Sequence, residues 1–557
     1  MKNLLGIMVL GLLLSGCSNQ KETSIENCAD SSFINYKVGK LVIMFIDTTD
    51  PRLVQYNNAL ELANKELDDE YDYKIAAAKS YRTFGKKYLK KKTDSTQTIN
   101  REYIDPPNYE GDKRSSEKYK YFYSSILAEE KKIADKINNS EKNIKELKYK
   151  TIIFDKNKNS PAFKISDLSF AIDFKKYKNV IKKLHQLKKN KDINYQGIIT
   201  MGCDVPYIIT KIAEEFNLQS NSIKSAKISE DKNLMKKLFL KTKIRTSKYA
   251  IIRNPIQALD FWKKNNVTHV VIKPTDNSGS KGVQLLHSYK QIEAAIKNAK
   301  KNTKKKHLII EEFLEGPQLS TESIIYKGKV FTPGLSHRHY EQVKFFLPQI
   351  MENGGTVSLK YKSYIIKINK IIKKIADELK FESGVIKGDF VINKKHLNII
   401  EFTTRLSGGD FSESVAPLSN GINYVKEAVK IAANKSITIN NLKPKFSRIT
   451  ANRYFFLPPG ILSQIKGLSE VKKIKELKKI EFYYKINSKI SKIDSHSKRV
   501  GVFIVVTKDK KKLNKIISKI YNKVFFRVNN NWTKGRPDDL KDIYKVNSDL
   551  KSINMFK

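Results

Sequence analysis

Two carboxylates, Asp389 and Glu401, stand in neighbouring segments whose pattern predicts strands. Asp389 lies within the apolar run VIKGDFVI, and Glu401 closes NKKHLNIIEF after a polar turn at 393–396. This pattern predicts a hairpin whose paired strands aim both carboxylates at one spot. Such a pair suits Mg²⁺, because this hard cation takes oxygen ligands and keeps its remaining positions for phosphates. Arg405 adds a forked cationic donor four residues later; the alternative is that all three are surface charges.

A pair of lysines and a loop of small residues precede these carboxylates. Lys232 opens an amphipathic helical pattern, and Lys273 ends the β-branched run THVVIK. Seven polar or small residues, 275–281, then lead to Gly282 and a second strand. A Ser/Gly loop between strands lets backbone N–H groups close over phosphates, and a strand-end lysine reaches them as a point charge. An ordinary hairpin with a flexible tip is the alternative.

Two further polar groups follow between the loop and the hairpin. A strand runs to Glu311 and Glu312, breaks at Gly316-Pro317 and resumes near Ser320, with Glu322 on one side. A strand end of this kind commonly forms an adenine-binding hinge, in which backbone groups read the base. The cluster SHRHYEQ then places His337, Arg338 and His339 where they can bind a carboxylate substrate, or lie at the surface.

Length and composition describe a globular, strongly basic chain. At 557 residues and 40% hydrophobic content, the chain is long enough for several domains. Its formal charge of +49 would ordinarily indicate a nucleic-acid or membrane partner. The lysines, however, are spread along nearly the whole chain and no RNA- or DNA-binding motif is present. We therefore expect compositional drift toward lysine and no nucleic-acid partner, although a basic field attracts anionic small molecules.

The pattern of the first residues is typical of an export signal. A short basic start precedes LLGIMVLGLLL, which is too short to span a bilayer, and LSGC places Cys17 directly after it. This pattern resembles the lipobox of bacterial lipoproteins, in which that cysteine carries the lipid anchor. The alternative is a buried first element of a cytosolic protein.

The three cysteines have no CxxC spacing, so neither a thiolate zinc site nor a disulfide framework is expected.

The order of the elements divides the chain into segments. KLVIMFID predicts a buried strand within an otherwise polar N-terminal region, and from Tyr149 alternating strands and helices predict a parallel doubly wound sheet. The expected divisions are a signal peptide at 1–17, an N-terminal region of unknown role with a Lys-rich linker at 18–147, an α/β domain at 148–224, a nucleotide-binding domain at 225–444, a C-terminal α+β lobe at 445–528 and a tail at 529–557.

Taken together and in this order, the motifs resemble the ATP-grasp superfamily. The C-terminal stretch ANRYFFLPPGILSQIKGL, with LSGG after Arg405, is similar to the carboxylate–amine ligase branch that includes L-amino acid ligases. The resemblance implies an α/β (α+β) class, namely an ATP-grasp fold with a partial doubly wound pre-ATP-grasp domain and a small C-terminal lobe. It also implies amide-bond formation through an acyl phosphate, with ATP converted to ADP and phosphate, and substrates that are a small carboxylate and an amine. A homodimer is compatible with it.

The resemblance also implies roles for individual residues. Arg405 would stabilise the transferring phosphoryl group. ATP would be held by Lys232, Lys273, Ser278, Gly279, Ser280, Gly282, Glu311, Glu312, Leu314 and Glu322; two Mg²⁺ ions, or Mn²⁺, by Asp389, Glu401 and Thr403; and substrate by His337, Arg338, Ser407 and Gly408.

Two departures from the family pattern leave other functions open. Thr403 stands where many members have Asn, and the Gly-rich first βα unit expected just before YKTIIFD is missing. The ATP-grasp machinery could therefore be vestigial, in a membrane-anchored envelope lipoprotein that acts as a binding module. A carbamoyl-phosphate synthase or biotin carboxylase-like enzyme is a further alternative. The lipobox and the ATP chemistry point to different compartments, the cell envelope and the cytoplasm, which a gene fusion would reconcile.

Overall fold

The computed structural model describes the backbone of residues 40–45 and the chain from 149 to 540, apart from 159, 165, 191, 192 and 341. The lipobox at Cys17 and most of the region predicted as N-terminal linker lie outside these residues, so the lipid anchor stays a prediction. Among the helices that are described, none combines the length and the apolar character needed to cross a membrane.

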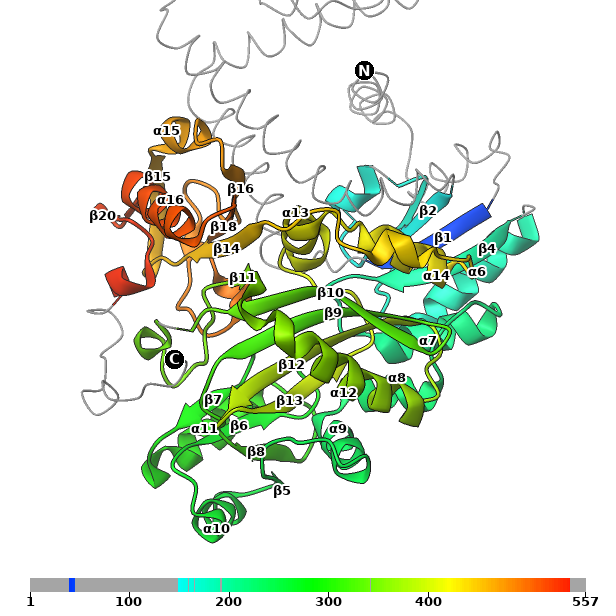
Figure 1. The fold of residues 1–557 in the computed structure, drawn as a ribbon, viewed down its shortest axis with the longest axis horizontal. Coiled ribbons are helices and arrows are strands. Elements are labelled where there is room, and N and C mark those ends of the chain that lie inside the picture. The colour runs from blue at the N-terminus through cyan, green and yellow to red at the C-terminus, as the bar shows by residue number, and fades with distance from the viewer. Residues whose placement is uncertain are drawn as a thin grey trace, which may run out of the picture.

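A parallel sheet of four strands forms the first domain (Figure 1). Its order is β3 (Leu168–Phe170), β2 (Lys150–Phe154), β1 (Lys40–Phe45) and β4 (Asn194–Thr200). The helices α6 (Tyr177–Asn190) and α7 (Pro206–Glu215) pack with β4 around a core that includes Ile152, Leu184 and Ile212. The parallel sheet predicted from the alternating pattern is therefore present.

The position of β1 differs from the sequence-based expectation. The segment was predicted to be a strand, which is correct, but it was placed outside the α/β domain at 148–224. In the structure β1 pairs in parallel with both β2 and β4, so it lies in the middle of the sheet. Of the first βα unit expected just before YKTIIFD, the strand is thus supplied from about a hundred residues upstream. A strand's partners depend on long-range pairing, which local patterns do not reveal.

The region predicted to bind nucleotide, 225–444, contains two antiparallel sheets. The smaller has the order β5 (Tyr249–Ile252), β8 (Leu308–Glu312), β6 (Val270–Pro274) and β7 (Gln284–Leu286), and it packs on α10 (Pro255–Asn265) and α11 (Ile292–Lys301). Their shared core includes Trp262, Ile272 and Ile296. The preceding helices are α8 (Ile223–Glu230) and α9 (Lys232–Lys241), and the side chain of Asp231 caps the N-terminus of α9.

The larger sheet continues from this region into the C-terminal lobe. Its eight antiparallel strands follow the order β13 (His396–Thr403), β12 (Gly384–Asn393), β9 (Gln318–Tyr326), β10 (Lys329–Arg338), β11 (Gly355–Val357), β14 (Ile449–Phe455), β18 (Gly501–Thr507) and β16 (Leu477–Phe482). The helix α12 (Ile365–Glu378) packs on β9 and β10, and α14 (Tyr424–Ala432) packs on β9, β12 and β4, next to α13 (Ala416–Asn420). The lobe predicted at 445–528 therefore shares one continuous sheet with the region before it.

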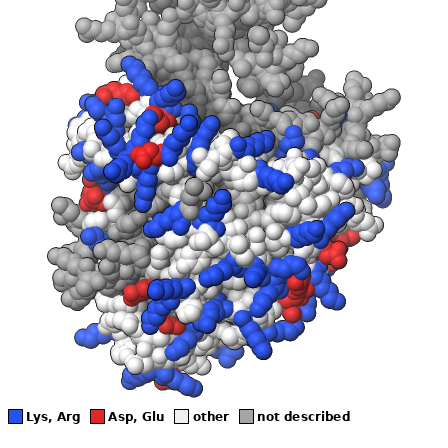
Figure 2. Space-filling model, in the orientation of Figure 1, with Lys and Arg blue, Asp and Glu red and all other residues white. Residues whose placement is uncertain are grey.

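A second small sheet completes the C-terminal lobe. It is formed by β17 (Lys489–Ile490), β15 (Gly460–Lys466), β19 (Phe525–Val528) and β20 (Asn531–Thr533), with α15 (Leu468–Lys472) and α16 (Lys510–Lys523). An aromatic cluster joins the two sheets of the lobe, because the ring of Phe455 on β14 contacts those of Phe503 and Phe526. On the face in Figure 2, lysines and arginines are scattered over this lobe and over the domain below it.

Candidate functional site

A cavity of about 1160 Å³ lies where the two antiparallel sheets and the first domain meet. Its lining includes Lys273 from β6, Glu311 from β8, Ser320 from β9, Asp389 from β12 and Glu401 from β13. The loop after β4, the loop between β6 and β7, and the segment after β17 complete it. The cavity thus gathers most of the residues that the sequence singled out.

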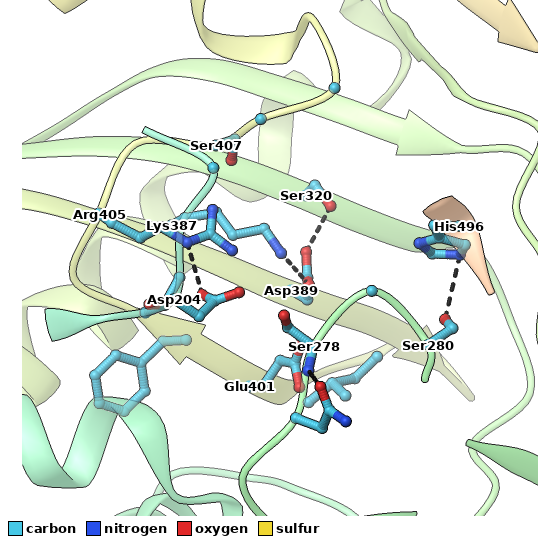
Figure 3. Close-up of a pocket in the computed structure, with 18 of the residues that line it drawn as sticks. Asp204, Ser278, Ser280, Ser320, Lys387, Asp389, Glu401, Arg405, Ser407 and His496 are labelled. Atoms are coloured by element: carbon cyan, nitrogen blue, oxygen red, sulfur yellow. Dashed lines mark hydrogen bonds and ion pairs between the residues drawn. The ribbon is translucent and has the colours of Figure 1, made fainter. Parts of the chain in front are cut away.

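The predicted carboxylate pair is confirmed as a geometric unit. Asp389 and Glu401 are directly opposite partners on the antiparallel strands β12 and β13, and both line the cavity. Figure 3 shows the two side chains on the same face of the sheet. Ser320 Oγ donates a hydrogen bond of 2.5 Å to Asp389 Oδ1. Opposite pairs in a sheet have Cβ atoms about 5 Å apart, so one small cation can contact both carboxylates.

Lys232 connects this pair to the Ser/Gly loop. Its Nζ lies 3.3 Å from Glu401 Oε2 and donates to the carbonyl oxygen of Asn277 at 2.7 Å. Burial disfavours the charged forms of Lys232 and Glu401, but the attraction of the opposite charges outweighs the effect of burial. The pKa of Lys232 is therefore raised by Glu401, and the pKa of Glu401 is lowered by Lys232 and Lys387. Both groups are therefore ionised at neutral pH.

A buried ion triad includes two residues of the cavity lining, Lys273 and Glu311. Glu311 Oε1 lies 2.7 Å from Lys273 Nζ, and Glu311 Oε2 lies 2.9 Å from Lys236 Nζ. Burial alone would raise the pKa of Glu311, but the two ammonium groups lower it to about 2. Lys236 also donates to Thr246 Oγ1 and Ser247 Oγ, at 2.7 and 2.9 Å. Lys236 was not among the predicted residues, although it lies one helical turn after Lys232 on the same face.

Arg405 is fixed by an acidic partner from the first domain. Its Nε donates to Asp204 Oδ1 at 2.6 Å, and its Nη1 donates to the carbonyl oxygen of Leu406 at 3.0 Å. Burial opposes the charge of Asp204, but the guanidinium outweighs it and keeps the pKa of Asp204 below its ordinary value. Asp204 was also missed, although it follows the carboxyl end of β4, where parallel sheets place ligand-binding groups.

A second cluster of charges adjoins Asp389. Lys387, two residues earlier on β12, forms an ion pair with Asp389 Oδ2 (Figure 3). Arg338 Nη1 lies 3.5 Å from Asp389 Oδ1, and Arg338 also pairs with Glu352. Arg499, from the C-terminal lobe, is also buried and lines the cavity. The strand period of two places Lys387 and Asp389 on one face, so the sequence held a signal for this lysine.

The other predicted site residues divide into two groups. Those that line the cavity are Ser278, Gly279, Ser280, Glu312, Leu314, Thr403, Ser407 and Gly408. Glu322, His337 and Gly282 are not part of the lining, and the predicted ATP and substrate contacts of these three stay predictions.

The three exceptions have structural explanations. Glu322 is buried beside Ser412, whose Oγ donates to Glu322 Oε1 at 3.3 Å, and burial raises the pKa of Glu322 to about 7. His337 alternates with Arg338 along β10 and packs its ring against Tyr361. Gly282 has a φ of +71°, and a Cβ there would lie 2.9 Å from the Cβ of Asn302, so this glycine serves the turn.

Comparison with known protein families agrees with this geometry. Residues 230–411 match the family described as phosphoribosylglycinamide synthetase, ATP-grasp (A) domain. We therefore call the region predicted to bind nucleotide the ATP-grasp domain, after the family that residues 230–411 match. Residues 453–529 match the L-amino acid ligase C-terminal domain 2. The ATP-grasp domain therefore carries Lys232, Lys273, Asp389, Glu401 and Arg405, all within the matched range.

Two curated relatives match part of this chain. The phosphoribosylamine–glycine ligase of Clostridium acetobutylicum is 27% identical over 246 residues, which are 41% of this chain and 58% of that protein. The formate-dependent phosphoribosylglycinamide formyltransferase of Prochlorococcus marinus is 25% identical over 313 residues, which are 55% of this chain and 76% of that protein. The chain thus spans less than two thirds of the Clostridium ligase.

Solved structures show the same fold at low identity. Phosphoribosylglycinamide synthetase from Anaerococcus prevotii aligns with a TM-score of 0.55 and 22% identity, over 70% of this chain and 96% of that one. L-amino acid ligase from Bacillus licheniformis aligns with a TM-score of 0.57 and 17% identity, over 69% and 93%. These likenesses confirm the predicted ATP-grasp fold.

Proposed function

We propose that this protein is an ATP-dependent ligase that joins a carboxylate to an amine through an acyl phosphate. The observation that carries the proposal is the convergence of Asp389 and Glu401 with Lys232, Lys273 and Arg405 on one cavity. Two acidic groups beside several fixed cations suit the transfer of a phosphoryl group, because that chemistry depends on positioning anions and neutralising their charge. The relatives include a protein named phosphoribosylamine–glycine ligase, which supports C–N bond formation.

The donor set fits magnesium bound together with phosphates. Asp389 and Glu401 would hold the metal ion, with the Thr403 hydroxyl next along β13. No group of three or more His, Cys, Asp or Glu residues that could cage a metal occurs among the described residues. A pair of carboxylates completed by substrate oxygens is the usual protein environment of Mg²⁺. When bound, Mg²⁺ would neutralise phosphate charge and orient the transferring group.

The proposed reaction has two steps, and in each of them side chains of this protein would bind phosphate or neutralise charge. An oxygen of the acid attacks the γ-phosphorus, the bond to the β–γ bridging oxygen breaks, and ADP leaves. The amine nitrogen then attacks the acyl carbon, the bond from that carbon to the phosphate oxygen breaks, and the amine loses a proton. We assign Lys232 and Lys273 to the phosphates, and Arg405, held in place by Asp204, to the charge that develops on the transferring group.

The match of residues 453–529 bears on the choice of substrates. It favours amino acids over the substrates of the carbamoyl-phosphate synthase and biotin carboxylase alternatives, because this domain type is named for L-amino acid ligases. Lys387 and Arg338 beside Asp389, with Arg499 in the same cavity lining, suit an anionic acid substrate. None of the comparisons favours the envelope-lipoprotein alternative.

The test is ADP release by the purified full chain with Mg·ATP and a panel of amino acids and small dicarboxylates. We expect release only when both an acid and an amine are supplied. Asp389→Asn combined with Glu401→Gln should lower the rate by at least about 100-fold, since the metal ligands are lost. Asp377→Asn, at an exposed carboxylate of α12, is the matched control and should leave the rate unchanged. Full activity in the double variant would contradict the metal assignment.

A further inference from the structure

A short segment of the C-terminal lobe reaches across the cavity to the Ser/Gly loop. The backbone N–H of His496 donates to the carbonyl oxygen of Gly279 at 3.1 Å. The ring Nε2 of the same histidine lies 3.2 Å from Ser280 Oγ. Figure 3 shows His496 facing Ser280 at one side of the cavity. One residue therefore contacts two consecutive residues of a loop more than two hundred positions away in the sequence.

The contacted part of the loop has an unfavourable backbone conformation. Gly279 and Ser280 both have positive φ, +64° and +60°. A Cβ built on Gly279 would meet nothing within 4 Å, so this stretch is not held by packing at that point. For a residue with a side chain, such as Ser280, the left-handed region is strained and persists where neighbouring groups hold it. His496 supplies two such interactions.

The environment keeps the histidine ring neutral. Burial and then the nearby cations Arg499, Arg338 and Lys387 lower the pKa of His496 well below its ordinary value. A neutral ring has one nitrogen that accepts a hydrogen bond and one that donates. The contact with the Ser280 hydroxyl is therefore available throughout the neutral pH range.

The same segment also holds the other side of the cavity. Arg499, three residues after His496, lies with its Nη2 3.1 Å from Glu352 Oε1 and its guanidinium 3.9 Å from the centre of the Tyr454 ring. Glu352 in turn pairs with Arg338, which reaches Asp389. The segment thus links the loop to the carboxylate that we assign to the metal.

We propose that His496 is a positioning residue, which holds the Ser/Gly loop of the ATP-grasp domain in the conformation that closes over nucleotide phosphates. The inference rests on the proposed function, because it requires this loop to bind ATP. It adds a task for the C-terminal lobe: nucleotide binding would depend on a residue that lies outside the ATP-grasp domain. Gln is the conservative replacement, since its amide nitrogen can take the place of Nε2.

Hydrogen exchange of the full chain without nucleotide tests the contact directly. In His496→Ala, the peptide covering 275–283 should exchange faster than in the wild type, and His496→Gln should restore slow exchange. The affinity for Mg·ATP, measured by calorimetry, should fall about 5- to 10-fold in the Ala variant, as expected for one lost hydrogen bond, and recover in the Gln variant. His185→Ala, at a half-exposed histidine on α6, is the control.

Ser280→Ala removes the same contact from the loop side and leaves the lobe intact. It should reproduce the faster exchange and the weaker ATP binding, and combining it with His496→Ala should add little. Unchanged exchange of the loop in both single variants would overturn the proposal. A second result would also overturn it: faster exchange of the loop in His496→Ala but not in Ser280→Ala, accompanied by faster exchange of β18. That result would indicate that the lobe has unfolded. Absence of ADP release by the wild type would refute the ligase function, whereas the exchange result would still decide the role of His496.

Discussion

The triad of Glu311, Lys236 and Lys273 shows how individual charges are tolerated inside this protein. Each side chain is buried, and each would be costly there without a partner. The carboxylate lies between the two ammonium groups, so its removal would leave two buried cations facing each other. We therefore expect Glu311 to matter for stability as well as for the shape of the cavity wall.

Glu311→Gln should lower the free energy of unfolding at pH 7 by about 3–5 kcal/mol, the cost of breaking a buried ion pair. The folded-state pKa of Glu311 is about 2, below the ordinary value of 4.5. Its stabilisation is therefore complete above pH 4.5 and is lost as the pH falls from 4.5 toward 2. Denaturant unfolding of both proteins between pH 7 and 3 measures this, with Glu312→Gln as the neighbouring control. An equal difference at pH 7 and pH 3 would contradict the assignment.

The β12–β13 hairpin is the element on which the site depends. Its register places Asp389 opposite Glu401, and a shift by one residue would turn one of the two carboxylates away from the cavity. The two-residue turn consists of Lys394 and Lys395, which have φ values of +46° and +66°. A two-residue turn with positive φ at both positions favours the sequence Asn-Gly. The two lysines are therefore strained in this turn, which is remote from the residues that we assign to the chemistry.

Lys394→Asn combined with Lys395→Gly should stabilise the hairpin by about 1 kcal/mol, because both residues then accept positive φ without strain. The opening free energy of the hairpin amides, obtained from hydrogen exchange, measures the effect. The double alanine variant at the same positions serves as the control and should show no gain. If the Asn-Gly variant opened more easily than the wild type, the turn would not be a source of strain.

At the scale of the whole molecule, three regions of the chain meet at one cavity. The first domain contributes Asp204, the ATP-grasp domain contributes the carboxylates and lysines, and the C-terminal lobe contributes Arg499 and His496. The first domain also packs closely on the ATP-grasp domain: a Cβ on Gly197 of β4 would lie 2.4 Å from the carbonyl oxygen of Ala432 at the end of α14. The position of Asp204 therefore depends on an intact parallel sheet, in which β1 is a central strand.

A truncated chain that begins at residue 115 should lose ATP-dependent activity, because it lacks β1 and leaves β2 and β4 without their shared partner. A chain that begins at residue 36 keeps β1 and should retain the activity of the full chain. Size-exclusion chromatography and ADP release compare the two. A soluble and fully active chain from residue 115 would show that the site forms without this strand.

Much of the site was predictable because its residues belong to local patterns. The alternation of VIKGDFVI and NKKHLNIIEF indicated the hairpin and its two carboxylates, and the β-branched run before Lys273 indicated a strand that ends in a loop. Local patterns did not indicate the positions of residues that depend on partners distant in the sequence. Glu322 follows the same alternation as Ser320, yet only Ser320 reaches the cavity, because Ser412 and its neighbours cover Glu322.

The sequence alone determined the order of the strands and loops that carry the ATP-grasp chemistry, since hydrophobic periodicity and turn residues act over short distances. Only the tertiary structure decided that β1 completes the first sheet, that Asp204 fixes Arg405, and that His496 contacts the Ser/Gly loop. These contacts join residues separated by about a hundred positions or more, and such pairing is selected by the packing of the whole chain rather than by any local preference.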